Sequence, residues 1–136
     1  MSAAAPVWGI LVTHGLLGAE FVRTAESILG AQTELEIVSN TGMAPEKFRE
    51  QLEALVEQRR PAVILVDLLG GSCGHACLLV GRSRPGVRVV SGVNLPMLLE
   101  FLCHRGRVSL AELEARLLSR GRDGIRSAGD DREVEG

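Results

Sequence analysis

Two residues of this sequence have the types and positions that nucleophilic chemistry at a histidine requires. His14 comes just after the apolar run of residues 7–12, and Asp67 ends the apolar run of residues 62–67. A carboxylate that accepts a hydrogen bond from the Nδ1–H of an imidazole fixes the tautomer and leaves Nε2 with a lone pair. If the two runs are neighbouring strands, we expect Asp67 to orient His14 and Nε2 of His14 to act as the nucleophile.

Small residues beside this pair could hold an anion. Gly15 follows the histidine, and Gly70, Gly71 and Ser72 follow the aspartate at the start of an expected helix. Glycines let backbone N–H groups approach an anion, a helix N-terminus adds a favourable dipole, and the serine hydroxyl adds a donor. A nucleophilic nitrogen beside an anion cradle is typical of a phosphohistidine site. We therefore expect phosphoryl binding by Gly15, Gly70, Gly71 and Ser72.

A second set of residues, Cys73, His75 and Cys77, leaves a different hypothesis open. On a helix Cys73 and Cys77 share a face at i and i+4, whereas His75 points away from it. A tetrahedral zinc site needs four ligands, or three and an open position. The pattern therefore predicts no metal, and a metal site or a redox-sensitive Cys73 near a helix start stays an alternative.

Composition limits the classes of protein to which the chain can belong. Its 136 residues fit one domain, and 46% of them are hydrophobic, which allows a sizeable core. The net charge of −2 and the scarcity of aromatic residues argue against nucleic-acid binding. No apolar run approaches the roughly 20 residues that span a bilayer, and no signal peptide is recognisable. The odd number of cysteines, three, favours reduced thiols in the cytoplasm.

The elements that must position these side chains alternate between strands and helices. Short apolar runs predict strands over residues 7–12, 35–39, 62–67 and 87–93. Apolar residues at helical spacing predict helices over residues 17–29, from Pro45, from about 72 to 80, over 95–104 after Asn94, and after the capping box that Ser109 begins. We expect one α/β domain over residues 1–128 and a disordered polar tail over residues 129–136.

This alternation implies a doubly wound, mainly parallel sheet with helices on both faces. We expect the strand order 2-1-3-4. In such a sheet, ligands bind beyond the carboxyl ends of the strands where the order reverses, here between the first and third strands. His14 and Asp67 follow these two strands.

Four segments together resemble a known family in their order and spacing. They are residues 10–15 (ILVTHG), 25–30 (AESILG), 65–72 (LVDLLGGS) and 90–98 (VSGVNLPML), and the likeness extends through residues 121–125. On these segments the sequence resembles the mannose-type enzyme IIA components of the phosphoenolpyruvate-dependent sugar phosphotransferase system, a family that also includes fructose and sorbose members.

The resemblance implies a function for the site. His14 would accept a phosphoryl group from the phosphohistidine of an HPr-like carrier and pass it to a separate IIB component, without a cofactor. Asp67 would orient the imidazole, and Ser72 would lie in the loop that receives the phosphoryl oxygens. The resemblance also implies a homodimer in which an antiparallel C-terminal strand, here residues 124–128, is exchanged between the subunits. Peripheral association with a membrane permease complex is implied as well.

The sequence departs from the family just after the glycines. Transport members usually continue with serine, proline, a bulky residue and asparagine, whereas residues 72–75 read SCGH. The departure leaves the partner open, so a regulator whose phosphorylation state reports sugar or phosphoenolpyruvate status is an alternative. A binding module with an unmodified His14 is another. A histidine-phosphatase type of hydrolase would need an arginine where Thr13 stands.

Overall fold

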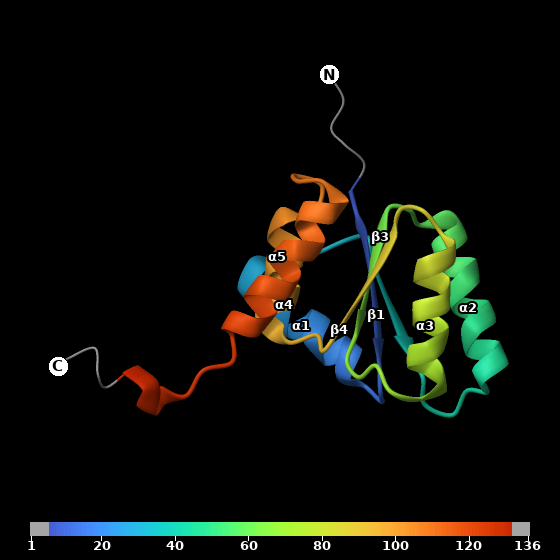
Figure 1. Cartoon of the computed structure of the whole chain (residues 1–136), viewed down its shortest axis with the longest axis horizontal. Coiled ribbons are helices and arrows are strands. Elements are labelled where there is room, and N and C mark those ends of the chain that lie inside the picture. The colour runs from blue at the N-terminus through green and yellow to red at the C-terminus, as the bar shows by residue number, and fades with distance from the viewer. Residues whose placement is uncertain (1–5, 132–136) are drawn as a thin grey trace, which may run out of the picture.

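The computed structural model describes residues 6–131, which form a parallel sheet with helices on both faces (Figure 1). The strands are β1 (Trp8–Thr13), β2 (Leu35–Ser39), β3 (Ala62–Val66) and β4 (Val87–Ser91). One face is covered by α2 (Pro45–Gln58) and α3 (Gly71–Ser83), and the other by α1 (Leu17–Leu29), α4 (Leu95–His104) and α5 (Leu110–Asp123). A 3-10 helix, η1 (Ala128–Asp131), follows α5.

The strand order is β2-β1-β3-β4 with every neighbouring pair parallel, which confirms the predicted order 2-1-3-4. Val12 of β1 lies beside Val38 of β2 and Val66 of β3. The carboxyl ends of these three strands are therefore level with one another. The residues that follow them meet at one edge of the sheet, at the point where the order reverses.

The strands are buried on both faces, which explains why they read as nearly continuous apolar runs. Successive side chains point to opposite faces, so each central strand contributes to two clusters of buried residues. The cluster under α2 and α3 includes Ile10, Val12, Ile64, Val66, Phe48, Leu52, Val56 and Val80. The cluster under α1, α4 and α5 includes Leu11, Val63, Leu65, Ala25, Leu98, Phe101, Leu113 and Leu117.

The helices begin at the residues that the sequence predicts. The Asn94 side chain accepts a hydrogen bond from the Met97 N–H at 3.0 Å at the start of α4, and the Ser109 hydroxyl accepts one from Glu112 at 3.1 Å at the start of α5. The Asn94 amide also donates to the Gly121 carbonyl at 3.0 Å, which ties α4 to α5. Within residues 6–131 no helix is both long and apolar enough to cross a membrane.

Some element ends differ from the sequence predictions. β1 begins and ends one residue later than predicted, at Trp8 and Thr13, and β3 ends at Val66, so Asp67 follows the strand rather than ending it. α3 continues to Ser83 rather than to about residue 80. β4 ends at Ser91, two residues before the predicted end, because the chain turns at Gly92, whose φ is 76°. Such a left-handed conformation favours glycine and breaks the extended backbone of a strand.

The segment predicted as the C-terminal strand, residues 124–128, is not a strand in this single chain. The Gly124 N–H donates to the Arg120 carbonyl at 3.1 Å and closes α5, and the backbone then leads to η1 (Figure 1). Exchange of this segment between subunits involves a second chain, so the exchange and the homodimer stay predictions. Residues 132–136 of the predicted tail lie outside the described residues.

Arg105, just after α4, fastens the amino-terminal edge of the sheet. Its guanidinium donates to the carbonyls of Val7, Glu34 and Thr33 at 3.3, 3.0 and 2.6 Å and to the Gln32 side chain at 3.2 Å. Burial lowers the pKa of Arg105 from its ordinary value, and the nearby Glu34 opposes this shift. One half-buried side chain therefore joins the starts of β1 and β2 to α4.

Replacing Arg105 with methionine tests this joint. Arg105→Met keeps an apolar stem but removes all four hydrogen bonds of the guanidinium, and within the described residues only the Glu34 carbonyl keeps another donor, the Gly9 N–H. We therefore expect the free energy of unfolding to fall by about 2 kcal/mol. Urea unfolding followed by circular dichroism measures the change. Arg107→Met removes a neighbouring exposed arginine and should stay within about 0.5 kcal/mol of the wild type. Equal losses in the two variants would contradict the role of Arg105.

Candidate functional site

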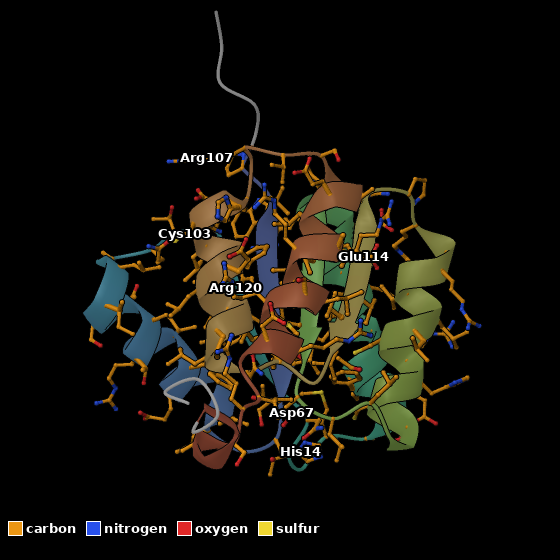
Figure 2. All side chains as sticks on the ribbon, turned by 60° about the vertical axis from the view of Figure 1, so that its left-hand side comes forward. His14, Asp67, Cys103, Arg107, Glu114 and Arg120 are labelled. Carbon is orange, nitrogen blue, oxygen red and sulfur yellow. The ribbon has the colours of Figure 1, made fainter. Side chains whose placement is uncertain are left out.

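Three polar residues meet at the carboxyl edge of the sheet, one after each of three adjacent strands. His14 follows β1, Asn40 follows β2 and Asp67 follows β3. The Asn40 N–H donates to the Thr13 carbonyl at 3.1 Å and the Asp67 N–H to the Val12 carbonyl at 3.2 Å. These bonds extend the sheet just beyond the strands and hold the backbones of Asn40 and Asp67 against β1. Figure 2 shows His14 and Asp67 together at this end of the molecule.

The structure brings His14 and Asp67 together as the sequence predicts. Nδ1 of His14 lies 3.1 Å from Oδ2 and 3.3 Å from Oδ1 of Asp67, and the His14 backbone N–H donates to Oδ2 at 2.9 Å. The His14 side chain is 57% exposed and that of Asp67 only 13%. A sheltered carboxylate thus lies within hydrogen-bond distance of Nδ1 of a largely exposed imidazole, and the catalytic roles of the two residues stay predictions.

Asn40 completes the surroundings of the imidazole, and the sequence analysis missed it. Its Nδ2 lies 3.3 Å from Nε2 of His14. Because Nδ1 carries its proton toward Asp67, Nε2 has the lone pair and the Asn40 amide is the donor. The signal was available, since Asn40 directly follows the run of residues 35–39, just as Asp67 ends the run of residues 62–67.

A cavity of about 360 Å³ opens beside the imidazole. Three of the predicted phosphoryl-binding residues, Gly70, Gly71 and Ser72, line it. The complete lining is His14, Asn40, Thr41, Met43, Gly70, Gly71, Ser72 and Cys73, with no lysine or arginine among these described residues. An anion in this cavity would therefore meet neutral donors.

Gly15, the fourth residue for which the sequence predicts phosphoryl binding, lies beside His14 in the chain but outside the cavity lining. Its N–H donates to Oγ1 of Thr41 at 2.9 Å. The bond joins the loop after β1 to the loop after β2. Gly15 has a φ of 55°, so a glycine suits this turn. Its phosphoryl contact stays a prediction and would require the bond to Thr41 to open.

The loop after Asp67 folds tightly against the first turn of α3. A Cβ atom at Gly74 would lie 1.7 Å from the Leu69 carbonyl oxygen, so only glycine fits there. Gly71, at the start of the helix, has a φ of 84°. The glycine at position 74, where the sequence departs from the family pattern, therefore lets the cavity-lining loop lie directly on the helix.

Cys73, His75 and Cys77 do not come together as a ligand set. Cys73 is half-buried and lines the cavity of His14, whereas exposed His75 lines a separate groove between α2 and α3. Cys77 lies in the core, where burial, with a smaller effect of Cys73, raises the pKa of its thiol to about 12. Within residues 6–131 no three His, Cys, Asp or Glu side chains are placed to hold a metal ion.

This arrangement defines a class, namely a small α/β domain that presents an accessible imidazole at the switch point of a four-stranded parallel sheet. A family model described as "PTS system fructose IIA component" matches residues 9–118. The chain belongs to this family, the fructose- and mannose-type enzyme IIA components of the sugar phosphotransferase system.

Individual relatives agree with this assignment. The chain is 32% identical over 124 residues to the mannose-specific EIIAB component of the phosphotransferase system of Escherichia coli K12, which covers 87% of this chain and 38% of that relative. The chain therefore spans well under half the length of the curated relatives that it matches.

Solved structures share the fold. The mannose/sorbose-specific IIA subunit from Enterococcus faecalis superposes with a TM-score of 0.81 at 27% identity, over 90% of this chain and 95% of that chain. The EIIA component from Streptococcus agalactiae superposes with a TM-score of 0.84 at 24% identity, over 91% and 98%. At that lower identity the second likeness shows the fold alone.

The contact of Gly74 with the cavity-lining loop gives a stability prediction. Replacing a glycine inside a helix with alanine ordinarily raises the free energy of unfolding, by up to about 1 kcal/mol. Gly74→Ala should instead lower the free energy of unfolding, by about 2 kcal/mol, because its methyl group meets the rigid Leu69 carbonyl.

Gly121→Ala is the matched control, since the only short approach of its methyl group would be to the movable end of the Met97 side chain, at 2.8 Å. The next atoms, Cβ of Met97 and Oδ1 of Asn94, lie at ordinary contact distances of 3.6 and 3.7 Å. We expect this control to stay within about 1 kcal/mol of the wild type in urea unfolding. A Gly74→Ala protein as stable as the wild type would mean that the loop does not need its close approach to α3.

Proposed function

We propose that this chain is a phosphocarrier that takes a phosphoryl group on Nε2 of His14. The donor is the phosphohistidine of an HPr-like carrier protein, and the acceptor is a separate IIB component. The observation that carries the proposal is the His14–Asp67 pair, in which Nδ1 lies 3.1 Å from the carboxylate while the imidazole side chain is 57% exposed. Membership of the enzyme IIA family supports the same class of reaction.

In the proposed step the lone pair of Nε2 attacks the phosphorus of the donor's phosphohistidine. The phosphorus–nitrogen bond of the donor breaks, and its electron pair returns to the donor's imidazole. The Nδ1 proton of His14 stays in its hydrogen bond to Asp67, whose negative charge stabilises the positive charge that develops on the ring. Transfer to the acceptor runs through the same events in reverse, with His14 as the leaving group.

The residues around His14 suit a phosphoryl group that is later transferred to an acceptor protein. Phosphorylation adds about two negative charges. The cavity would meet them with neutral donors, namely the Ser72 hydroxyl and backbone N–H groups at the start of α3, because its lining contains no lysine or arginine. Neutral donors form hydrogen bonds to the phosphoryl oxygens but add no opposite charge, so the phosphoryl group is held without the ion pair that a lysine or arginine would form.

A regulatory role would use the same phosphorylated state. Cys73, one of the residues that depart from the family pattern, lines the cavity of His14. The surface that a partner would meet around the phosphohistidine therefore differs from the usual pattern of the transport members. This difference supports a second candidate function, a regulator that acts through its phosphorylation state. The two candidates differ in whether His14 passes its phosphoryl group to a IIB component.

Phosphorylation by phosphoenolpyruvate, enzyme I and HPr tests the proposal directly. We expect the intact mass of the wild type to rise by one phosphoryl group and that of His14→Ala to stay unchanged. His75→Ala is the matched control, because it removes an exposed histidine outside the cavity and should be phosphorylated like the wild type. No mass increase in the wild type with its cognate carrier would refute the phosphocarrier, and labelling without transfer to a IIB component would favour the regulator.

Asp67→Asn tests the orienting role of the carboxylate. The amide can donate to Nδ1, which would move the imidazole proton to Nε2 and remove the nucleophilic lone pair. We expect phosphorylation of His14 to slow by roughly 100-fold or more, with the fold retained. Rapid-quench labelling measures the rate and thermal unfolding checks the fold. A wild-type rate in a folded Asp67→Asn protein would rule out the assigned role.

A further inference from the structure

We infer that Asn40 is a further residue of the phosphoryl site. Its side-chain amide donates to the lone pair of His14 Nε2 in the unphosphorylated protein, and donates to a phosphoryl oxygen once the group is attached. This inference rests on the proposed function. It adds a side chain to which neither the sequence motifs nor the family resemblance assigned a role.

The geometry around the ring identifies the donor. Nδ2 of Asn40 lies 3.3 Å from Nε2 of His14, and on the other side Nδ1 lies 3.1 Å from the Asp67 carboxylate. A carboxylate can only accept and the amide nitrogen can only donate, so the two partners select the same tautomer. Asn40 therefore touches the nitrogen that reacts in the proposed step.

The position of Asn40 is fixed independently of its side chain. Its backbone N–H donates to the Thr13 carbonyl at 3.1 Å, directly beside His14. The next residue, Thr41, accepts a hydrogen bond from the Gly15 N–H at 2.9 Å. Two bonds thus hold the loop after β2 against the loop after β1, and they keep the backbone of Asn40 beside the ring whichever acceptor its amide binds.

Attachment of a phosphoryl group changes what the amide can bind. Once the phosphorus–nitrogen bond forms, Nε2 has no lone pair left to accept a hydrogen bond. The nearest new acceptors are the phosphoryl oxygens, which are bonded to the phosphorus on that same nitrogen. Asn40 also lines the cavity into which these oxygens would project. A small rotation of the amide therefore exchanges one acceptor for another.

This exchange predicts that the phosphoryl group leaves His14 more slowly than it would without the Asn40 amide. Phosphoryl groups leave through a metaphosphate-like state that carries less charge on its oxygens than the attached dianion. A donor to those oxygens stabilises the attached group more than the departing one. Because the amide is neutral, it slows spontaneous loss without holding the group as firmly as a lysine or arginine would.

The experiment uses the full chain and potassium phosphoramidate, a small phosphoryl donor that needs no partner protein. After labelling, the donor is removed and the loss of the phosphoryl group is followed by intact mass. We expect Asn40→Ala to be labelled on His14 and to lose the group roughly three- to tenfold faster than the wild type, the effect of one ordinary hydrogen bond. Gln51→Ala, which removes an exposed amide from α2, should match the wild type.

Asn40→Asp is the second variant and predicts a larger effect. A carboxylate at this position repels the phosphoryl group. It can only accept a hydrogen bond, so it favours the form of the ring that carries a proton on Nε2 and therefore has no lone pair there. We therefore expect labelling slower than in either the wild type or Asn40→Ala. The wild type also gives a measurement that needs no variant: the nitrogen resonances of the His14 ring should show Nε2 as the unprotonated nitrogen.

The outcomes separate this inference from the proposed function. If the wild type is labelled and Asn40→Ala loses the group at the wild-type rate, the role of Asn40 is wrong and the phosphocarrier stands. A proton on Nε2 of the unmodified wild type would also overturn the role of Asn40. If neither phosphoramidate nor the carrier protein labels His14, both proposals fall together.

Discussion

The hydrogen bonds of the Asp67 carboxylate are the interaction around which the site is organised. The carboxylate accepts from the His14 backbone N–H at 2.9 Å and faces the Nδ1 of the same residue at 3.1 Å. One side chain therefore sets both the course of the chain after β1 and the tautomer of the ring. This is achieved only because β1 and β3 are neighbours in a parallel register that pairs Val12 with Val66.

The loops after β2 and β3 complete the site on either side of the His14–Asp67 pair. The loop after β2 brings an amide to the free ring nitrogen, and the loop after β3 lies on the first turn of α3 because Gly74 has no side chain. Both loops line one cavity, and none of its described lining residues is a lysine, arginine, aspartate or glutamate. Under the proposed function, the site would combine an oriented imidazole with little attraction for free anions.

The alternation of strands and helices led to the predicted strand order. The meeting of His14 with Asp67 then followed, because that order makes the first and third strands neighbours. Asn40 was missed for two reasons. Its amide is not ionisable, so it was not considered as a catalytic group, and it follows residues 35–39, the least apolar of the first three predicted strands. The contact of Gly74 with Leu69, only five residues away, depends on the exact backbone path into α3, which a pattern of residue types does not specify. The bond between Gly15 and Thr41 depends instead on the approach of two loops that are distant in the sequence.

The Arg105 joint lies at the opposite end of the sheet from His14, near the end where Figure 2 shows Arg107. Arg105 thus holds the sheet at the edge away from His14, and the edge that carries the imidazole consists of loops held by short extensions of the strand pairing. Under the proposed function, the surface that a partner protein would meet lies at the opposite edge of the sheet from the Arg105 contacts. Loop substitutions that spare the close contact of Gly74 with Leu69 would therefore alter that surface and leave the hydrogen bonds of Arg105 unchanged.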